Sequence, residues 1–301
     1  MRPLSDRPSS PGKRFARLAY SRMAYVDEGA GPPVLLLHGC PFSSSVWRGV
    51  SARLAGRYRC LAPDLLGAGD TETHPRGDWR LPEQARAVRG LLDALGVERA
   101  AVVGHGHGGA VAQLIALRYP ERVSALVLAG SQAYDNWPST IERPFFHFAQ
   151  QPMVGRMMTW NWSRRPLFRQ WLVNHHLVHD TRALTPGLVD GCVRDNLTGW
   201  RRRARTRRLM GAQLNRANQA HTRTAAGELS ALTLPTLLLW GEEDAHYPPR
   251  WGERLRADIP GAVRLELVPG AGHLLMAERP DHVASALDAF LGAHGADGGT
   301  R

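Results

Sequence analysis

The 301-residue chain has almost no lysine: Lys13 is the only one, and the other 37 of its 38 basic residues are arginines. Its three cysteines (Cys40, Cys60 and Cys192) are too few and too scattered for a disulfide framework. The longest apolar runs, such as "VLLL" and "TLLLW", suit buried strands and are too short to cross a bilayer. The beginning, "MRPLSDRPSSPGKR", lacks the apolar stretch of a secretory signal. These absences predict a cytoplasmic protein with no membrane partner.

The net charge of +11 invites a nucleic-acid partner, but the usual marks of one are missing. No zinc-finger spacing, RNA-binding aromatic motif or helix-turn-helix pattern accompanies the arginines, so we expect no nucleic acid. The arginines are spread along the chain, except in "WRRRARTRRLM" at 200–210. Such a general preference for arginine over lysine is typical of the base composition of a genome rather than of selection for a partner. We interpret the Arg201–Arg208 cluster as the solvated face of a surface helix. The alternative is a docking patch for an acidic carrier protein or a phosphorylated substrate.

Strand and helix signals alternate through most of the chain. Runs such as "PVLLLHG", "RAAVVGH" and "PTLLLWG" read as buried strands, and "LPEQARAVRGLLDALG" reads as an amphipathic helix. This rhythm predicts an α/β fold with a mostly parallel central sheet and helices on both faces. A tryptophan- and arginine-rich segment of irregular helical spacing interrupts it. The predicted division is a disordered tail at 1–14, core at 15–131, a helical cap at 132–228, core again at 229–294, and a flexible tail at 295–301.

Four short segments place chemically capable residues at the predicted carboxyl ends of strands, where open α/β sheets bind ligands. They are "HGCP" at 38–41, "GHGHGG" at 104–109, "WGEED" at 240–244 and "GAGHLLMAERP" at 270–280. Their order and spacing closely resemble the α/β-hydrolase fold superfamily. The elbow "GHGHGGAVAQ", the stretch "RYPERVSALVLAG" and the insertion after it are most similar to the epoxide hydrolase and haloalkane dehalogenase branch.

This resemblance implies a role for each segment. The family's elbow reads G-x-nucleophile-x-G, and its central serine, aspartate or cysteine corresponds to Gly106. The family's acid maps onto Asp244 and its histidine onto His273. Its oxyanion hole, built from backbone N–H groups, maps onto Cys40 and His107. The acid, the base and the anion-binding amides are therefore present, and the nucleophile is absent.

Glycine at the elbow excludes a covalent intermediate at this position and leaves an aspartate–histidine dyad opposite an oxyanion hole. Such a pair can remove a proton beside a carbonyl and stabilise the enolate. The leading hypothesis is a cofactor-free enzyme, a lyase or isomerase of natural-product biosynthesis. It would epimerise, isomerise, eliminate from or cyclise a hydrophobic carbonyl compound. One alternative is a hydrolase that activates water directly against an ester, lactone or epoxide. Others are a catalytically silent binding protein and an engineered nucleophile knockout.

Competing interpretations of the same motifs are weaker. "GHGHGG" also fits the dinucleotide pattern G-x-G-x-x-G, but it follows a late strand and no acidic residue ends the next one. His105 and His107 should diverge at a sharp elbow and have no acidic or cysteine neighbour, so we expect no metal. Cys40 could replace the nucleophile if a nearby cation lowered its pKa, or it could simply fill the loop.

The binding pocket is expected to depart from that of the resembled branch. Haloalkane dehalogenases place a halide-binding asparagine at the position of Cys40 and a tryptophan at that of His107. The insertion holds only Tyr134, so the pair of lid tyrosines of epoxide hydrolases is also missing. We name His38, Tyr134 and Trp137 as candidate substrate-binding residues and expect the other tryptophans of the insertion to line the pocket or fill the cap.

Overall fold

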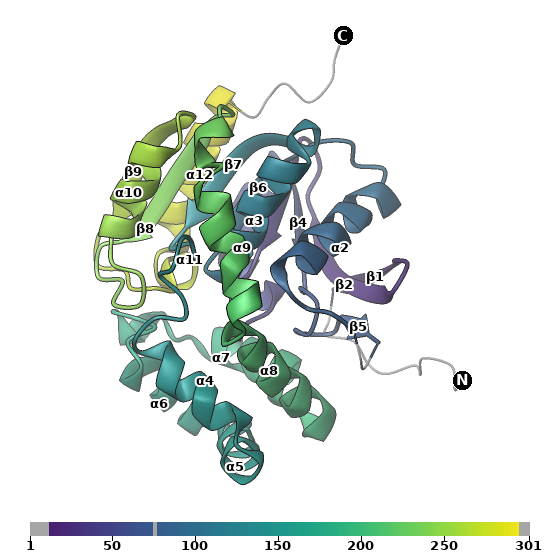
Figure 1. Cartoon of the computed structure of the whole chain (residues 1–301), viewed down its shortest axis with the longest axis vertical. Coiled ribbons are helices and arrows are strands. Elements are labelled where there is room, and N and C mark those ends of the chain that lie inside the picture. The colour runs from purple at the N-terminus through teal and green to yellow at the C-terminus, as the bar shows by residue number, and fades with distance from the viewer. Residues whose placement is uncertain (1–11, 75–76, 295–301) are drawn as a thin grey trace.

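The computed structural model describes residues 12–74 and 77–294 and is built around one twisted sheet (Figure 1). The sheet has nine strands in the order β1-β2-β4-β3-β6-β7-β8-β9, with β5 beside β2. Strands β3, β4, β6, β7, β8 and β9 are parallel, whereas β1, β2 and β5 pair antiparallel at one edge. The predicted mostly parallel sheet is confirmed. Its strands are β1 (Lys13–Arg17), β2 (Ser21–Glu28), β3 (Pro33–Leu37), β4 (Arg59–Pro63), β5 (Glu72–Thr73), β6 (Ala100–His105), β7 (Val123–Ala129), β8 (Thr236–Gly241) and β9 (Ala262–Val268).

The central strands form where the sequence has continuous apolar runs, because helices cover the sheet on both sides. Every residue of β6 and β8 is buried. On one face α1 (Arg48–Leu54) packs against α12 (Pro280–His294), and on the other α2 (Leu81–Ala94) packs against α3 (His107–Arg118). Helix α10 (Arg250–Asp258) contacts β8 and β9, and the short α11 (Leu275–Glu278) precedes α12. No helix of the described ranges is long and apolar enough to span a bilayer.

Six helices lie between β7 and β8 and make up most of the segment that we predicted as a cap (Figure 1). Five of them form a layer beyond the end of the sheet, and the sixth runs back along the core against α2 and α3. An aromatic stack joins Phe145, Trp162 and Trp171 inside this layer. The helices are α4 (Glu142–Gln150), α5 (Pro152–Trp162), α6 (Arg165–Asn174), α7 (Pro186–Leu197), α8 (Gly199–Gln213) and α9 (Arg216–Ala226).

The arginine cluster lies on α8, and three of its members turn toward the core. Arg202 forms an ion pair with the buried Asp70. Arg205 donates to two backbone carbonyls of the loop after β4, at 2.6 and 2.8 Å. The guanidinium of Arg208 lies 4.1 Å from the ring centroid of Trp79. Arg202 and Arg205 therefore hold α8 against the core, and the interpretation of the cluster as a solvated face is wrong for these two, whereas Arg208 is exposed.

The only lysine also lies inside the protein. Lys13, predicted to belong to a disordered tail, is in β1, and its side chain is 3 % exposed. Its Nζ lies 2.7 Å from Asp64, 2.9 Å from Asp195 and 3.4 Å from Asp70. These partners come from the loop after β4 and from α7, so one ammonium joins the sheet edge to the cap. The tail predicted at 1–14 is thus wrong at Lys13 and Arg14, while 1–11 and the tail at 295–301 lie outside the described residues.

Replacing Lys13 by methionine should lower the free energy of unfolding by about 3 kcal/mol, because it removes the shared cation from buried carboxylates. Denaturation in urea, followed by circular dichroism, measures the change. The neighbouring Arg14→Met is the matched control, since the Arg14 side chain is 65 % exposed. Its salt bridge to Asp27 should contribute less than about 1 kcal/mol. Equal losses in the two variants would contradict a special role for Lys13.

Candidate active site

A sharp turn joins β6 to α3, and Gly106 stands at its centre. Gly106 has φ 52° and ψ −117°, a backbone conformation that side-chain-bearing residues rarely adopt. Two residues earlier, a Cβ on Gly104 would lie 2.3 Å from the carbonyl oxygen of Gly108. Glycine at that position therefore lets the helix start directly against the strand. The turn has the shape of a nucleophile elbow, but its centre carries no side chain.

Asp244 and His273 form a buried dyad beside this turn. The Nδ1–H of His273 donates to Oδ2 of Asp244 at 2.9 Å. The other carboxylate oxygen, Oδ1, accepts from the backbone N–H groups of His246 and Tyr247, both at 2.9 Å. These two bonds fix the carboxylate in the loop after β8. Because Nδ1 carries the proton, Nε2 of His273 is left as a proton acceptor.

The acceptor nitrogen of His273 faces the centre of the elbow. An ideal Cβ built on Gly106 would lie 3.5 Å from Nε2 of His273 and 3.6 Å from the Cα of Gly39. Both are ordinary van der Waals distances, so the turn has room for a Cβ. The structure thus brings Gly106, Asp244 and His273 together as the sequence predicts.

Burial determines the charge state of the dyad. Burial, with the nearby His246, lowers the pKa of His273 well below its ordinary value, so the ring is neutral at neutral pH. Burial raises the pKa of Asp244 to about 6, and the backbone N–H groups of Tyr247 and His246 limit that rise. At and above neutral pH the carboxylate is therefore ionised and the imidazole can accept a proton.

Two backbone amides lie where an oxyanion hole would be built. His107 is the first residue of α3, and Cys40 is in the loop after β3. Within the described ranges, neither amide N–H has a hydrogen-bond acceptor. The first N–H groups of a helix point along its axis and favour an anion there. These amides can therefore hold a developing negative charge.

The side chain of His107 is oriented by a residue that the sequence analysis did not single out. Its Nδ1 lies 3.1 Å from Oε1 of Gln132, and its Nε2 has no partner among the described residues. Burial lowers the pKa of His107 to about 4, so this ring is also neutral. Gln132 Nε2 in turn donates to the hydroxyl of Tyr247, which donates to Glu142 at 2.7 Å.

His246 adds a second ring beside the base. Its ring centroid lies 5.2 Å from that of His273, and its Nε2 lies 2.6 Å from the carbonyl oxygen of His175. His246 and Tyr247 directly follow the acid in "DAHYPP", so their position was readable from the sequence. Gln132 and Glu142 belong to the segment before and within α4, and no motif marks them.

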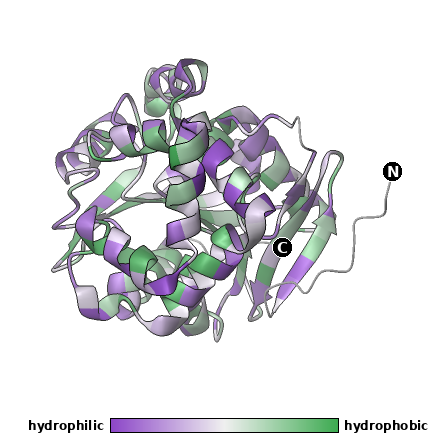
Figure 2. Ribbon diagram, turned by 90° about the horizontal axis from the view of Figure 1, so that it is seen from below, coloured by the Kyte–Doolittle hydropathy of each residue, from purple (hydrophilic) through white to green (hydrophobic). Residues whose placement is uncertain are grey.

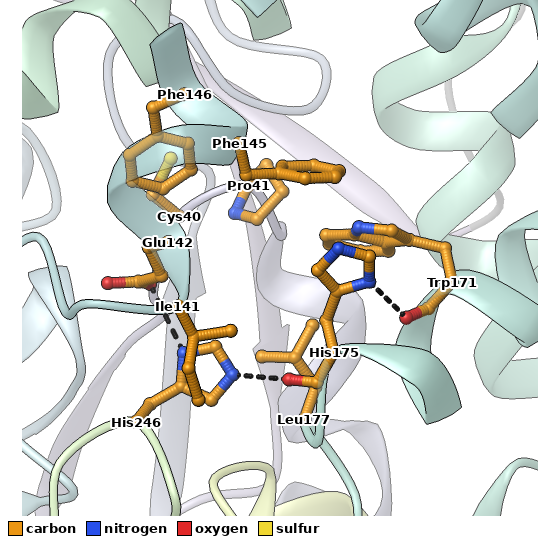
Figure 3. A pocket seen from close by; sticks show the side chains of 10 residues that line it. All are labelled: Cys40, Pro41, Ile141, Glu142, Phe145, Phe146, Trp171, His175, Leu177 and His246. Atoms are coloured by element: carbon orange, nitrogen blue, oxygen red, sulfur yellow. Dashed lines mark hydrogen bonds and ion pairs between the residues drawn. The ribbon is translucent and has the colours of Figure 1, made fainter. Parts of the chain in front are cut away.

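A small apolar pocket of about 10 Å³, room for about one water molecule, adjoins the dyad through His246 (Figure 3). Cys40, beside the elbow, and His246, stacked on the base, contribute to its wall. Aromatic rings from α4 and α6 form the opposite side, so the walls of the pocket are mostly apolar. It is lined by Cys40, Pro41, Ile141, Glu142, Phe145, Phe146, Trp171, His175, Leu177 and His246.

The Cys40 thiol does not have the surroundings of a substitute nucleophile. Burial, reinforced by the carboxylate of Glu142, raises the pKa of Cys40 well above its ordinary value. A reactive thiol needs the opposite shift. Of the two roles that the sequence left open, filling the loop is therefore favoured.

The three candidate substrate-binding residues lie outside this pocket. Both ring nitrogens of His38 are bonded to backbone groups, at 2.8 and 3.0 Å. The indole N–H of Trp137 donates to the hydroxyl of Thr222 at 2.8 Å. The hydroxyl of Tyr134 donates to Asp258 of α10 at 2.7 Å. All three side chains join loops or helices, and none of them points a free polar group at the dyad.

The histidines of the elbow diverge, as expected from the turn. Nε2 of His105 lies 2.9 Å from the backbone oxygen of His273, and the two rings are tilted with centroids 4.5 Å apart. His107 bonds to Gln132 on the other side of the turn. Across the described residues, no group of three or more His, Cys, Asp or Glu side chains could hold a metal ion.

The fold agrees with the comparison to known proteins. The α/β-hydrolase fold family matches residues 32–280, and the chain belongs to this family. Haloalkane dehalogenase 2 of Mycobacterium tuberculosis is 32 % identical over 270 residues, which cover 88 % of this chain and 90 % of that protein. The relatives are therefore haloalkane-dehalogenase-like, which confirms the resemblance read from the motifs.

Solved structures show the same architecture. A reconstructed ancestral haloalkane dehalogenase superposes with a TM-score of 0.78 at 25 % identity, covering 93 % of this chain and 98 % of the other. A thermophilic esterase from Thermogutta terrifontis superposes with a TM-score of 0.74 at 25 % identity and the same coverage.

Replacing Gly106 by alanine should lower the free energy of unfolding by about 1–3 kcal/mol, because alanine is strained at φ 52° although its Cβ meets no clash. Urea denaturation measures this change. The control is Gly187→Ala in the first turn of α7, where a Cβ meets open space and φ is not positive. That variant should be stabilised by about 0.5 kcal/mol. An unchanged Gly106→Ala would show that the elbow is not strained.

Proposed function

We propose that this protein is a hydrolase that forms no covalent enzyme intermediate. His273, oriented by Asp244, activates a water molecule directly against the carbonyl carbon of a hydrophobic ester or lactone. One observation carries the proposal: Nε2 of His273 lies 3.5 Å from where a Cβ at Gly106 would be. The base therefore faces the position of the missing nucleophile, which a water molecule can occupy.

The reaction follows from the groups around that position. Nε2 of His273 takes a proton from water while the hydroxide oxygen bonds to the carbonyl carbon. The carbonyl oxygen becomes an anion that the amides of Cys40 and His107 can stabilise. The ionised Asp244 stabilises the imidazolium. As the tetrahedral intermediate collapses, the carbonyl reforms, the alkoxide leaves, and the imidazolium returns the proton to it.

The relatives support a hydrolytic outcome, since the named ones are a haloalkane dehalogenase and an esterase. Dehalogenation itself is not supported. Displacing a halide requires a nucleophilic side chain at the elbow, and Gly106 offers none. Direct attack by water on a carbonyl needs only the dyad and the amides, which are present.

Proton transfer without hydrolysis is the second candidate function, and the low solvent exposure of the site favours it. His273 is 4 % exposed, and most of the neighbouring pocket is apolar. A carbonyl compound that filled the space above Gly106 would exclude water. Nε2 would then remove a proton beside the carbonyl, and the amides would hold the enolate. Returning the proton to another face or another atom would give an epimer or an isomer.

Isotope labelling separates these outcomes. The wild-type protein is incubated with 4-nitrophenyl butyrate and with hydrophobic lactones in ¹⁸O-labelled water, and with chiral α-substituted ketones in deuterated water. We expect ¹⁸O in the carboxylate product, and a loss of turnover in His273→Ala of about 10³-fold or more. Deuterium at the α-carbon without ¹⁸O incorporation would support the second candidate. Label incorporation that is unchanged in His273→Ala would overturn both.

Placing a hydroxyl at the elbow should change the mechanism from direct attack by water to one that proceeds through an acyl-enzyme. Gly106→Ser is expected to hydrolyse 4-nitrophenyl butyrate at least about 100-fold faster than wild type, with a burst of nitrophenol that reports an acyl-enzyme. Gly106→Ala is the matched control, because it carries the same backbone strain without the hydroxyl. The burst should vanish in Gly106→Ser/His273→Ala. A folded Gly106→Ser protein without a burst would show that the elbow and the base are not aligned as described.

A further inference from the structure

The positive charge of the chain is concentrated in the segment between β7 and β8. Residues 132–228 contain 15 arginines and six aspartates or glutamates, whereas the whole chain has a net charge of +11. The stretch from 143 to 179 contains five arginines and no carboxylate. It comprises α5, α6 and all of α4 except its first residue. The arginines are therefore not evenly spread, and this part of the surface is strongly basic.

Helix α5 carries large apolar side chains on the side that faces away from the protein. Met153, Val154, Met157 and Trp160 are 82 %, 40 %, 59 % and 48 % exposed, and their spacing places them on one face, here called the α5 face. The residues that pack inward, Gly155, Thr159 and Trp162, lie on the opposite side of the same helix. Water-exposed apolar groups gathered in this way are typical of an interaction surface.

Cations border the α5 face. The guanidinium of Arg164 lies 4.1 Å from the ring centroid of Trp160. Arg156 lies between the apolar residues of α5, and within the described part of the chain neither arginine forms an ion pair. Burial lowers the pKa of Arg207 on α8, and the positive charges of Arg156 and Arg203 lower it further. Positive charge thus gathers around an apolar surface without carboxylates to neutralise it.

We propose that the α5 face binds the surface of an anionic phospholipid bilayer. Its methionines and tryptophan would enter the boundary between headgroups and acyl chains, and the arginines would contact lipid phosphates. Helix α5 lies at the outermost end of the molecule, so a flat surface can reach it (Figure 1). Viewed from that end, apolar and polar residues alternate over the helices (Figure 2). The expectation of no membrane partner rested on the lack of a spanning segment, which does not bear on surface binding.

The charges argue for lipid over a second copy of this chain. In a dimer formed through two α5 faces, Arg156 and Arg164 of one copy would lie near the same arginines of the other and repel them. The stretch from 143 to 179 has no carboxylate that could pair with these arginines. Anionic headgroups supply the missing charge. An acidic protein would also supply it, and the experiment below distinguishes that case.

The α5 face is also connected to the candidate active site. Trp162, on the inward side of α5, stacks on Phe145 with centroids 4.9 Å apart, and Phe145 lines the pocket. A bilayer under α5 would therefore lie one aromatic layer from the apolar walls of this pocket. The binding proposal does not depend on the reaction that the site performs.

Sedimentation with lipid vesicles tests the proposal on the full chain. The vesicles contain phosphatidylcholine alone or with about 30 % phosphatidylglycerol, at salt between about 0.1 and 0.5 M. We expect binding to the anionic vesicles only, weakened by salt, and at least tenfold weaker, as an order of magnitude, for Met157→Glu/Trp160→Glu. The control is Tyr20→Glu/Val263→Glu, which changes two exposed apolar residues of the core, 78 % and 50 % exposed. It should bind like wild type.

Three results would overturn the proposal. The first is no sedimentation with anionic vesicles, the second is an equal loss of binding in the two double variants, and the third is a dimer, detected by light scattering, that Met157→Glu/Trp160→Glu dissociates. The third result would assign the α5 face to a second copy. Binding to a soluble acidic polypeptide, poly-glutamate, with none to vesicles, would assign it to an acidic protein. Circular dichroism of each variant checks that it is folded.

Discussion

The hydrogen bond from His273 to Asp244 determines what this site can do. It places the proton on Nδ1 and turns Nε2 toward the elbow, 3.5 Å from where a side chain would begin. Two backbone N–H groups hold the carboxylate from its other oxygen, so the pair stays aligned inside a buried region. The elbow has no side chain at its centre, and the base nevertheless faces it. An aligned base without a side chain to activate must act on water or on the substrate itself.

Glycine at the elbow also changes the energetics of the turn. Gly106 has φ 52° and ψ −117° in a turn where β6 and α3 approach closely, with a Cβ on Gly104 only 2.3 Å from the carbonyl oxygen of Gly108. A residue with a side chain would be strained by about 1–3 kcal/mol. Gly106 relaxes that strain, so stability is gained at the position where covalent chemistry is lost. The amides of Cys40 and His107 are set by the same turn and the loop after β3, and they do not depend on the missing side chain.

Most of the fold and the central part of the site could be predicted from the sequence. The buried central strands are continuous apolar runs, and Asp244 follows one of them, whereas His273 follows β9, "AVRLELV", most of whose residues are partly buried or exposed. Local patterns of this kind report which strand end a residue occupies. They do not report partners from distant segments. Gln132, which orients His107, comes from the segment before α4, and its role depends on a contact that no local pattern encodes.

The errors have the same physical origin. Tyr134 and Trp137 were chosen as aromatic residues near the start of the cap, yet Tyr134 bonds to α10 and Trp137 to α9. Lys13 was placed in a tail because its neighbours are prolines, serines and arginines, but three aspartates distant in sequence hold it in the sheet edge. Arg202 and Arg205 of α8 were interpreted as solvated because charged runs usually are. In each case a long-range polar contact decided where the side chain went.

These polar contacts connect the cap to the core in a way that bears on function. Lys13, Arg202 and Arg205 hold α7 and α8 to the loop after β4, so that side of the cap is fixed by buried ion pairs and carbonyl contacts. Helices α4 to α6 instead meet the core through the apolar pocket and the network of Glu142, Tyr247 and His246. The hydroxyl of Tyr247 donates to the Glu142 carboxylate at 2.7 Å, a charge-assisted hydrogen bond, and Glu278 of α11 accepts from the backbone N–H groups of His179 and Asp180, which follow α6. Both sides of the cap are therefore held to the core by polar contacts, and on the side of α4 to α6 two of the residues that make them, Glu142 and His246, also line the pocket beside the dyad.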